Sequence, residues 1–158
     1  MKWSFLVIFL IVVAPKISFS QEVKKLADNK YLYKPHADAK KQLNDALIAA
    51  QKNHRHVLVV VGGDWSYWSR LMWAYTIKNH SWNKNYQLVY INFSPANKNE
   101  SILTELKVPK DSGYPILVVL DETGKNLITT DTDNIKADQT AYDEELLTAF
   151  MEKWLTYK

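Results

Sequence analysis

A chain of 158 residues is long enough to bury the core of one domain, and its 47% hydrophobic residues argue against intrinsic disorder. Its formal net charge of +3 falls to +1, with 18 basic and 17 acidic residues left, if the first 20 residues, which carry Lys2 and Lys16, are removed. So small a charge indicates neither a nucleic acid nor an anionic membrane as partner. The chain contains no cysteine, which excludes disulfide bonds, thiolate metal sites and thiol catalysis.

Residues 1–20 have the pattern of a secretory signal peptide, with a basic residue near the start and an almost unbroken apolar run over Phe5–Ala14. Small residues stand at the first and third positions before Gln21, so we expect cleavage after Ser20. The apolar run is shorter than the roughly 20 residues that a transmembrane helix needs. We therefore expect an exported protein, periplasmic or fully secreted, with no integral membrane segment after cleavage. The alternative is an uncleaved membrane anchor.

The next segments are predicted to be a leader and the first helix of the domain. Residues 21–34 are polar and show no clear period, so we interpret them as a leader to a single domain over residues 35–158. Asp38 is a residue type that caps helix starts, and apolar residues follow it at helical spacing as far as Ala50. We expect this helix to end in the polar residues 51–55.

The stretch His56–Met72 is predicted to be a buried strand, a tight turn and the start of a helix. Val57–Val61 is a continuous run of Val and Leu, which is typical of a strand covered on both faces. Gly62 and Gly63 end the strand and allow backbone angles that other residues resist. Four apolar residues then follow at helical spacing: Trp68, Leu71, Met72 and Tyr75.

The rest of the chain alternates between strands and helices, which predicts an α/β domain with a mixed sheet. We expect the motif helix to fade over residues 79–82. The elements expected after it are a strand at Leu88–Phe93, a short helix around residues 102–106, strands at Ile116–Leu120 and Asn126–Thr130 joined by a hairpin turn, and a helix at Tyr142–Leu155.

Two motifs of this chain resemble the active-site segments of the thioredoxin-fold oxidoreductases. In GGDWSYWSRL, Trp65 matches the Trp of the W-C-x-x-C pattern of exported thioredoxin-family proteins, and Ser66 and Ser69 stand at the two cysteine positions. Residues Gly113–Pro115, followed by an apolar strand, resemble the family's cis-proline loop. The resemblance covers roughly Tyr33–Leu155. It implies a thioredoxin fold, an α/β structure with a central mixed β-sheet flanked by helices.

The resemblance does not carry the family's activity to this chain, because both steps of thiol–disulfide exchange need sulfur. A thiolate at a helix N-terminus attacks a disulfide, and the second thiol releases the mixed disulfide. Val60 also stands where many family members carry a buried carboxylate that accepts a proton. The alternative, a thiol–disulfide oxidoreductase of cell redox homeostasis, is suggested by homology alone.

The sequence offers two further candidate sites, a serine nucleophile and a histidine metal site, and both lack residues that they need. We interpret Ser66 as a helix cap, since a serine nucleophile needs a base and an orienting acid, and GGDWS is not a G-x-S-x-G motif. His54 and His56 suggest a metal pair, but no third ligand at ordinary zinc spacing follows them. We predict no catalytic residue, no metal site and no cofactor.

Aromatic residues crowd the motif and provide a candidate binding site. The resemblance implies that the cis-proline loop lies beside the motif turn, and an exposed aromatic patch beside an unpaired backbone edge suits an extended polypeptide. The candidate binding residues are Trp65, Tyr67, Trp68, Tyr114 and Pro115. We therefore predict a redox-inactive module that binds a polypeptide or a partner protein. The alternatives are that the rings only fill the core, or that a partner binds another surface such as the polar residues 129–139.

Overall fold

The computed structural model describes residues 17–156, and its centre is a sheet of four strands. The strands are β1 (His56–Gly62), β2 (Tyr86–Asn92), β3 (Ile116–Leu120) and β4 (Asn126–Thr130), in the spatial order β2-β1-β3-β4. β1 is parallel to β2 and antiparallel to β3, and β3 is antiparallel to β4. The predicted mixed α/β sheet is confirmed.

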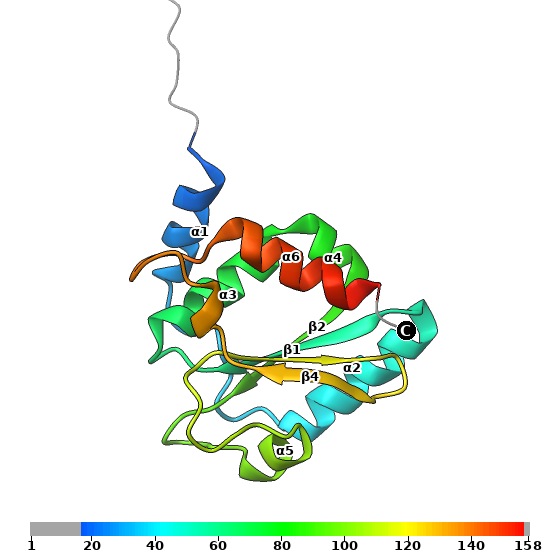
Figure 1. Cartoon of the computed structure of the whole chain (residues 1–158). Helices are drawn as coiled ribbons and strands as arrows, with labels where there is room; N and C mark the ends of the chain where they lie inside the picture. Colours follow the sequence, from blue (N-terminus) through cyan, green and yellow to red (C-terminus); the bar gives the residue numbers. More distant parts are fainter. Residues whose placement is uncertain (1–16, 157–158) are drawn as a thin grey trace, which may run out of the picture.

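Helices cover both faces of this sheet (Figure 1). They are α1 (Phe19–Ala27), α2 (Ala39–Asn53), α3 (Tyr67–Lys78), α4 (His80–Asn85), α5 (Glu100–Glu105) and α6 (Glu144–Leu155), with a short 3₁₀ helix η1 (Asp133–Ile135) after β4. Helices α1, α3, α4 and α6 contribute to one hydrophobic core, and α2 and α5 contribute to a second core on the opposite face of the sheet.

β1 is one of the two internal strands of the sheet, and its side chains contribute to both cores. All five residues of Val57–Val61 are 0% exposed. Leu58 and Val60 belong to the core beneath α3 and α6, whereas the three valines that alternate with them belong to the core beneath α2 and α5. Successive side chains of a strand point to opposite faces, so a strand covered on both faces needs the continuous apolar run that the sequence shows.

Side-chain caps set where the helices begin. The Asp38 carboxylate accepts a hydrogen bond from Lys41 N at 2.9 Å, which confirms the predicted start of α2. The carboxylate of Asp143 caps α6, which therefore begins slightly later than the sequence predicts. The motif helix α3 ends at Lys78, next to the residues where it was expected to fade, but the separate helix α4 was not predicted. The side chain of Asn79 accepts a hydrogen bond from Trp82 N at 3.1 Å and caps α4.

Helix α1 is missing from the sequence prediction, which assigns residues 21–34 to a polar leader. Val23 and Ala27 of α1 are fully buried in the same core as α3, and Glu22 forms an ion pair of 2.8 Å with Lys78. The helix has only nine residues. Two core positions four residues apart do not make a visible period, so the polar composition hid this helix.

The expected signal peptide lies mostly in residues 1–16, which are outside the described part of the chain. Among residues 17–156, no helix has the length and apolar character needed to cross a membrane. The expected cleavage point after Ser20 falls in the first turn of α1.

Candidate functional site

The turn from β1 into α3 and the loop before β3 meet at the end of the sheet. Ser66 is the N-cap of α3, and its Oγ accepts a hydrogen bond from Ser69 N at 3.2 Å. The same hydroxyl donates to the carbonyl oxygen of Tyr114 at 3.3 Å. The peptide bond between Tyr114 and Pro115 is cis. One serine therefore links the helix start to the proline loop, and its role as a helix cap is the one that the geometry shows.

Gly62 and Gly63 let the turn approach its neighbours closely. A Cβ atom on Gly62 would overlap the Oγ of Ser69. A Cβ atom on Gly63 would lie 2.6 Å from Trp65 Nε1 and from the carbonyl oxygen of Phe93. Such distances do not occur between a Cβ and other heavy atoms, so both positions need glycine. The glycines thereby place Ser69 and Trp65 directly against the end of the sheet.

Three rings, those of Trp65, Phe93 and Tyr114, form what we call the aromatic surface. The indole N–H of Trp65 donates to the carbonyl oxygen of Phe93 at 2.6 Å, which fixes a side chain that is 56% exposed. The ring of Tyr114 is stacked on Phe93 with centroids 4.4 Å apart, and its centroid is 5.8 Å from that of Trp65. The sequence analysis missed Phe93, although the parallel pairing of β1 and β2 places the residue after β2 beside the turn after β1.

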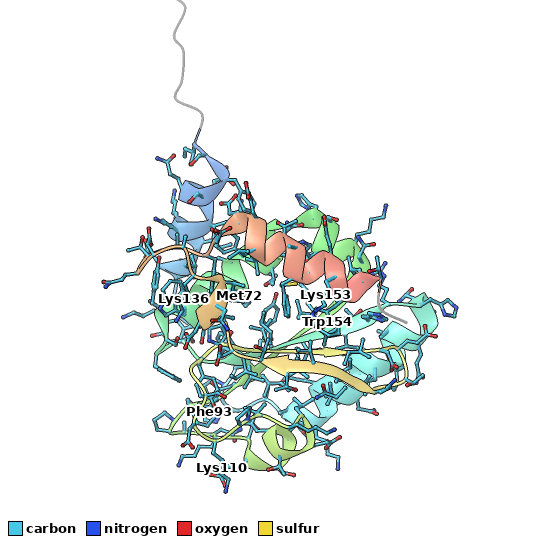
Figure 2. The ribbon with its side chains drawn as sticks, in the orientation of Figure 1. Met72, Phe93, Lys110, Lys136, Lys153 and Trp154 are labelled. Carbon is cyan, nitrogen blue, oxygen red and sulfur yellow. The ribbon has the colours of Figure 1, made fainter. Side chains whose placement is uncertain are left out.

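The side chains of Tyr67 and Trp68 are in contact with the segment that follows β4. The hydroxyl of Tyr67 donates to the carbonyl oxygen of Thr140 at 2.8 Å. The ring centroid of Trp68 is 5.0 Å from that of Tyr142 and 4.6 Å from the Nζ of Lys136, which is labelled in Figure 2. Both rings are half-buried. The structure therefore divides the five candidate residues into Trp65, Tyr114 and Pro115 at the proline loop, and Tyr67 and Trp68 beneath residues 131–142.

Ser69, which the sequence resemblance aligns with the second cysteine, is enclosed by the protein. It is 0% exposed, and its Oγ has no hydrogen-bond partner among the described residues. Its carbonyl oxygen accepts a hydrogen bond from the hydroxyl of Tyr33 at 3.3 Å. Burial is the main reason that the pKa of Tyr33 lies well above its ordinary value, and the neighbouring Tyr90 raises this pKa further. A buried hydroxyl without a partner costs about 1–3 kcal/mol, so this position suits a small apolar side chain or a thiol better than an alcohol.

Among the described residues, no histidine or carboxylate is hydrogen-bonded to Ser66. Its Oγ is hydrogen-bonded to Ser69 N and to the carbonyl oxygen of Tyr114, and neither atom accepts a proton from a nucleophile. Nδ1 of His54, a residue considered for metal binding, lies 3.0 Å from a carboxylate oxygen of Glu122. Within residues 17–156, no group of three or more His, Asp or Glu side chains is placed to hold a metal ion.

Comparisons with known proteins agree with this geometry at the level of the fold. No protein-family model and no curated protein matches the chain. A disulphide isomerase from Xylella fastidiosa Temecula1 is structurally similar, with a TM-score of 0.65 and 25% sequence identity over 77% of this chain and 95% of that one. A DsbH oxidoreductase matches with a TM-score of 0.51 and 17% identity over 84% of this chain and 89% of that one.

The chain has a thioredoxin fold. The fold class predicted from the two motifs is confirmed, and β1, α3 and the loop before β3 are the elements of this thioredoxin fold that build the site. The first neighbour is named as a disulphide isomerase and the second as an oxidoreductase, whereas this thioredoxin fold contains no cysteine. The redox dithiol is therefore absent. Ser66 and Ser69, which the sequence resemblance aligns with the two cysteines, lie at the start of α3.

Proposed function

We propose that this protein is an exported, redox-inactive thioredoxin-like module that binds an extended segment of polypeptide beside the proline loop. The observation that carries the proposal is the exposed indole of Trp65, fixed by a hydrogen bond and lying next to Tyr114 and Pro115. A ring held in place by the protein loses little conformational freedom on binding, and aromatic anchors of this kind supply much of the affinity of protein interfaces.

The backbone of the proline loop offers the second half of the site. Within the described residues, the N–H groups of Gly113 and Tyr114 donate no hydrogen bond. An extended peptide satisfies such groups by pairing with them as an added strand. Partial burial raises the pKa of the Tyr114 phenol, so the hydroxyl stays neutral and able to donate at physiological pH. Tyr67 and Trp68 support the start of α3 in this proposal, and Trp65 and Tyr114 contact the polypeptide. Pro115 is buried, so its part is to shape the loop that carries Tyr114.

The alternative, a thiol–disulfide oxidoreductase, conflicts with the chemistry of the chain. A serine hydroxyl at a helix N-terminus is not ionised at neutral pH, and it forms no reversible bond to sulfur. An insulin-reduction assay on the purified protein with dithiothreitol decides between the two functions. We expect a rate equal to the rate without protein, and a rate clearly above that blank would contradict the proposal.

Binding is tested with a labelled, reduced and carboxymethylated protein, which stays unfolded and exposes extended segments. We expect its fluorescence anisotropy to rise with added wild-type protein, and the affinity to fall about tenfold or more in Trp65→Ala and Tyr114→Ala. Ile48→Ala is the matched control, because it removes an exposed apolar side chain of α2 that lies outside the site. Circular dichroism must show that all variants fold. An affinity equal in wild type and both site variants would contradict the proposal.

A further inference from the structure

A groove continues from the aromatic surface toward α5. It has a volume of about 640 Å³ and lies between the end of β2, helix α5 and residues 107–114. Its apolar lining is Phe93, Leu103, Val108 and Tyr114, and its charged lining is Lys98, Glu100, Lys107 and Lys110. Figure 2 shows Phe93 and Lys110 at the end of the molecule where α5 lies. We call this feature the lysine groove.

The lysine groove carries an unbalanced positive charge. Three lysines line it and only one carboxylate, that of Glu100, accompanies them. None of the three ammonium groups forms an ion pair or hydrogen bond within residues 17–156, whereas Lys41, Lys78 and Lys136 elsewhere each meet a carboxylate. Carboxylates brought in by a partner would therefore meet lysines that no group of this chain neutralises.

The groove and the aromatic surface are continuous through two residues. Phe93 and Tyr114 line the groove, and the stacked pair that they form also contacts Trp65. A bound polypeptide that contacts Trp65 and pairs with the proline loop can therefore extend into the groove. This continuity favours a polypeptide over a small anion, which would use the lysines but neither the rings nor the backbone N–H groups.

We infer that the lysine groove selects polypeptide segments in which acidic residues flank an apolar side chain. The apolar side chain lies against Phe93 and Leu103, and the carboxylates lie beside the ammonium groups of the rim. This inference rests on the proposed function and adds a sequence preference to it. The preference is electrostatic, so it weakens as salt concentration rises.

The test compares two labelled peptides, one with Leu and Phe flanked by Glu residues and the other with Lys in place of each Glu. We expect wild-type protein at low salt to bind the acidic peptide about tenfold more tightly, since exposed charge pairs contribute modestly but add over three lysines. The variant Lys98→Gln, Lys107→Gln, Lys110→Gln is expected to lose most of this preference.

The matched control replaces three exposed lysines outside the groove: Lys52→Gln, Lys84→Gln and Lys125→Gln. Its net charge equals that of the groove variant, so a difference between the two variants reports contacts in the groove and not the attraction of the peptide to the net charge of the protein. We expect this control to keep at least about half of the wild-type preference. Equal loss in both triple variants would overturn the inference.

Two further outcomes separate this inference from the proposed function. If wild type binds both peptides equally and Trp65→Ala weakens both, the groove preference is wrong and the proposed function stands. If Trp65→Ala weakens neither peptide, the proposed function itself is wrong. Phosphatidylglycerol vesicles serve as a second anionic probe. If they bind through the same three lysines while the acidic peptide does not bind, the groove takes a membrane surface and the inference is overturned.

Discussion

Ser66 and Ser69 occupy equivalent places in the motif but have opposite surroundings. The Ser66 hydroxyl forms two hydrogen bonds at the start of α3, whereas the Ser69 hydroxyl is buried without a partner among the described residues. The sequence resemblance aligns both with cysteine positions, but it does not predict which hydroxyl forms hydrogen bonds. That difference depends on the loop before β3 and on the close approach of Gly62, which are tertiary features.

Alanine substitutions at these two serines are predicted to change stability in opposite directions. Ser66→Ala removes a helix cap and should lower the free energy of unfolding by about 1 kcal/mol. Ser69→Ala removes an unsatisfied buried hydroxyl and should raise that free energy by about 1 kcal/mol. Urea unfolding followed by circular dichroism measures both. A destabilised Ser69→Ala would show that its hydroxyl has a partner, such as a buried water.

Among the secondary-structure elements, segments with a clear apolar pattern were predictable, whereas the short polar helices α1 and α4 were not. The apolar run of β1 and the capped start of α2 follow from local sequence, and both are confirmed. Helix α1 was missed because its apolar contribution is small and it borders the expected signal peptide. Phe93 was missed because its position depends on the register of two strands far apart in the sequence. Residues 131–142 cover Tyr67 and Trp68, and nothing in the sequence around these two residues predicts that contact.

Helix α1 is predicted to be a structural part of the domain. Val23→Asp would place a charge in the core shared with α3, and should lower the free energy of unfolding by about 3 kcal/mol or more. Lys25→Asp introduces the same side chain on the exposed side of α1 and serves as the control. We expect the control to change stability by less than about 1 kcal/mol. Similar melting temperatures for wild type and Val23→Asp would show that α1 does not contribute to folding.

At the scale of the whole molecule, buried tyrosines link the fold to pH. Burial raises the pKa of Tyr90 to about 12, against an opposing hydrogen bond with Thr76. Burial, together with the Glu144 carboxylate, raises the pKa of Tyr75 to about 12. Burial also raises the pKa of Tyr86 and of Tyr142. These phenols therefore remain neutral in the folded protein at pH values where those of the unfolded chain ionise.

The stability from these tyrosines is predicted to be present below pH 10, the ordinary pKa of the phenol, and to be lost as pH rises toward 12. Above pH 10 the unfolded state releases protons that the folded state keeps, so unfolding becomes more favourable. Thermal unfolding between pH 8 and 12 should show a falling melting temperature above about pH 10. Absorbance at the phenolate band provides the control, since buried tyrosines should ionise together with unfolding. Ionisation of all tyrosines near pH 10 in a folded protein would contradict this account.

Polypeptide binding at the proline loop can be observed directly in a ¹H–¹⁵N NMR titration of the protein with the acidic peptide. We expect the largest shifts at the indole N–H of Trp65 and at the backbone N–H groups of Gly113 and Tyr114, with signals of α2 unchanged around Ile48. Shifts confined to other surfaces, such as residues 129–139, would contradict binding at the proline loop and place the function of this thioredoxin fold elsewhere.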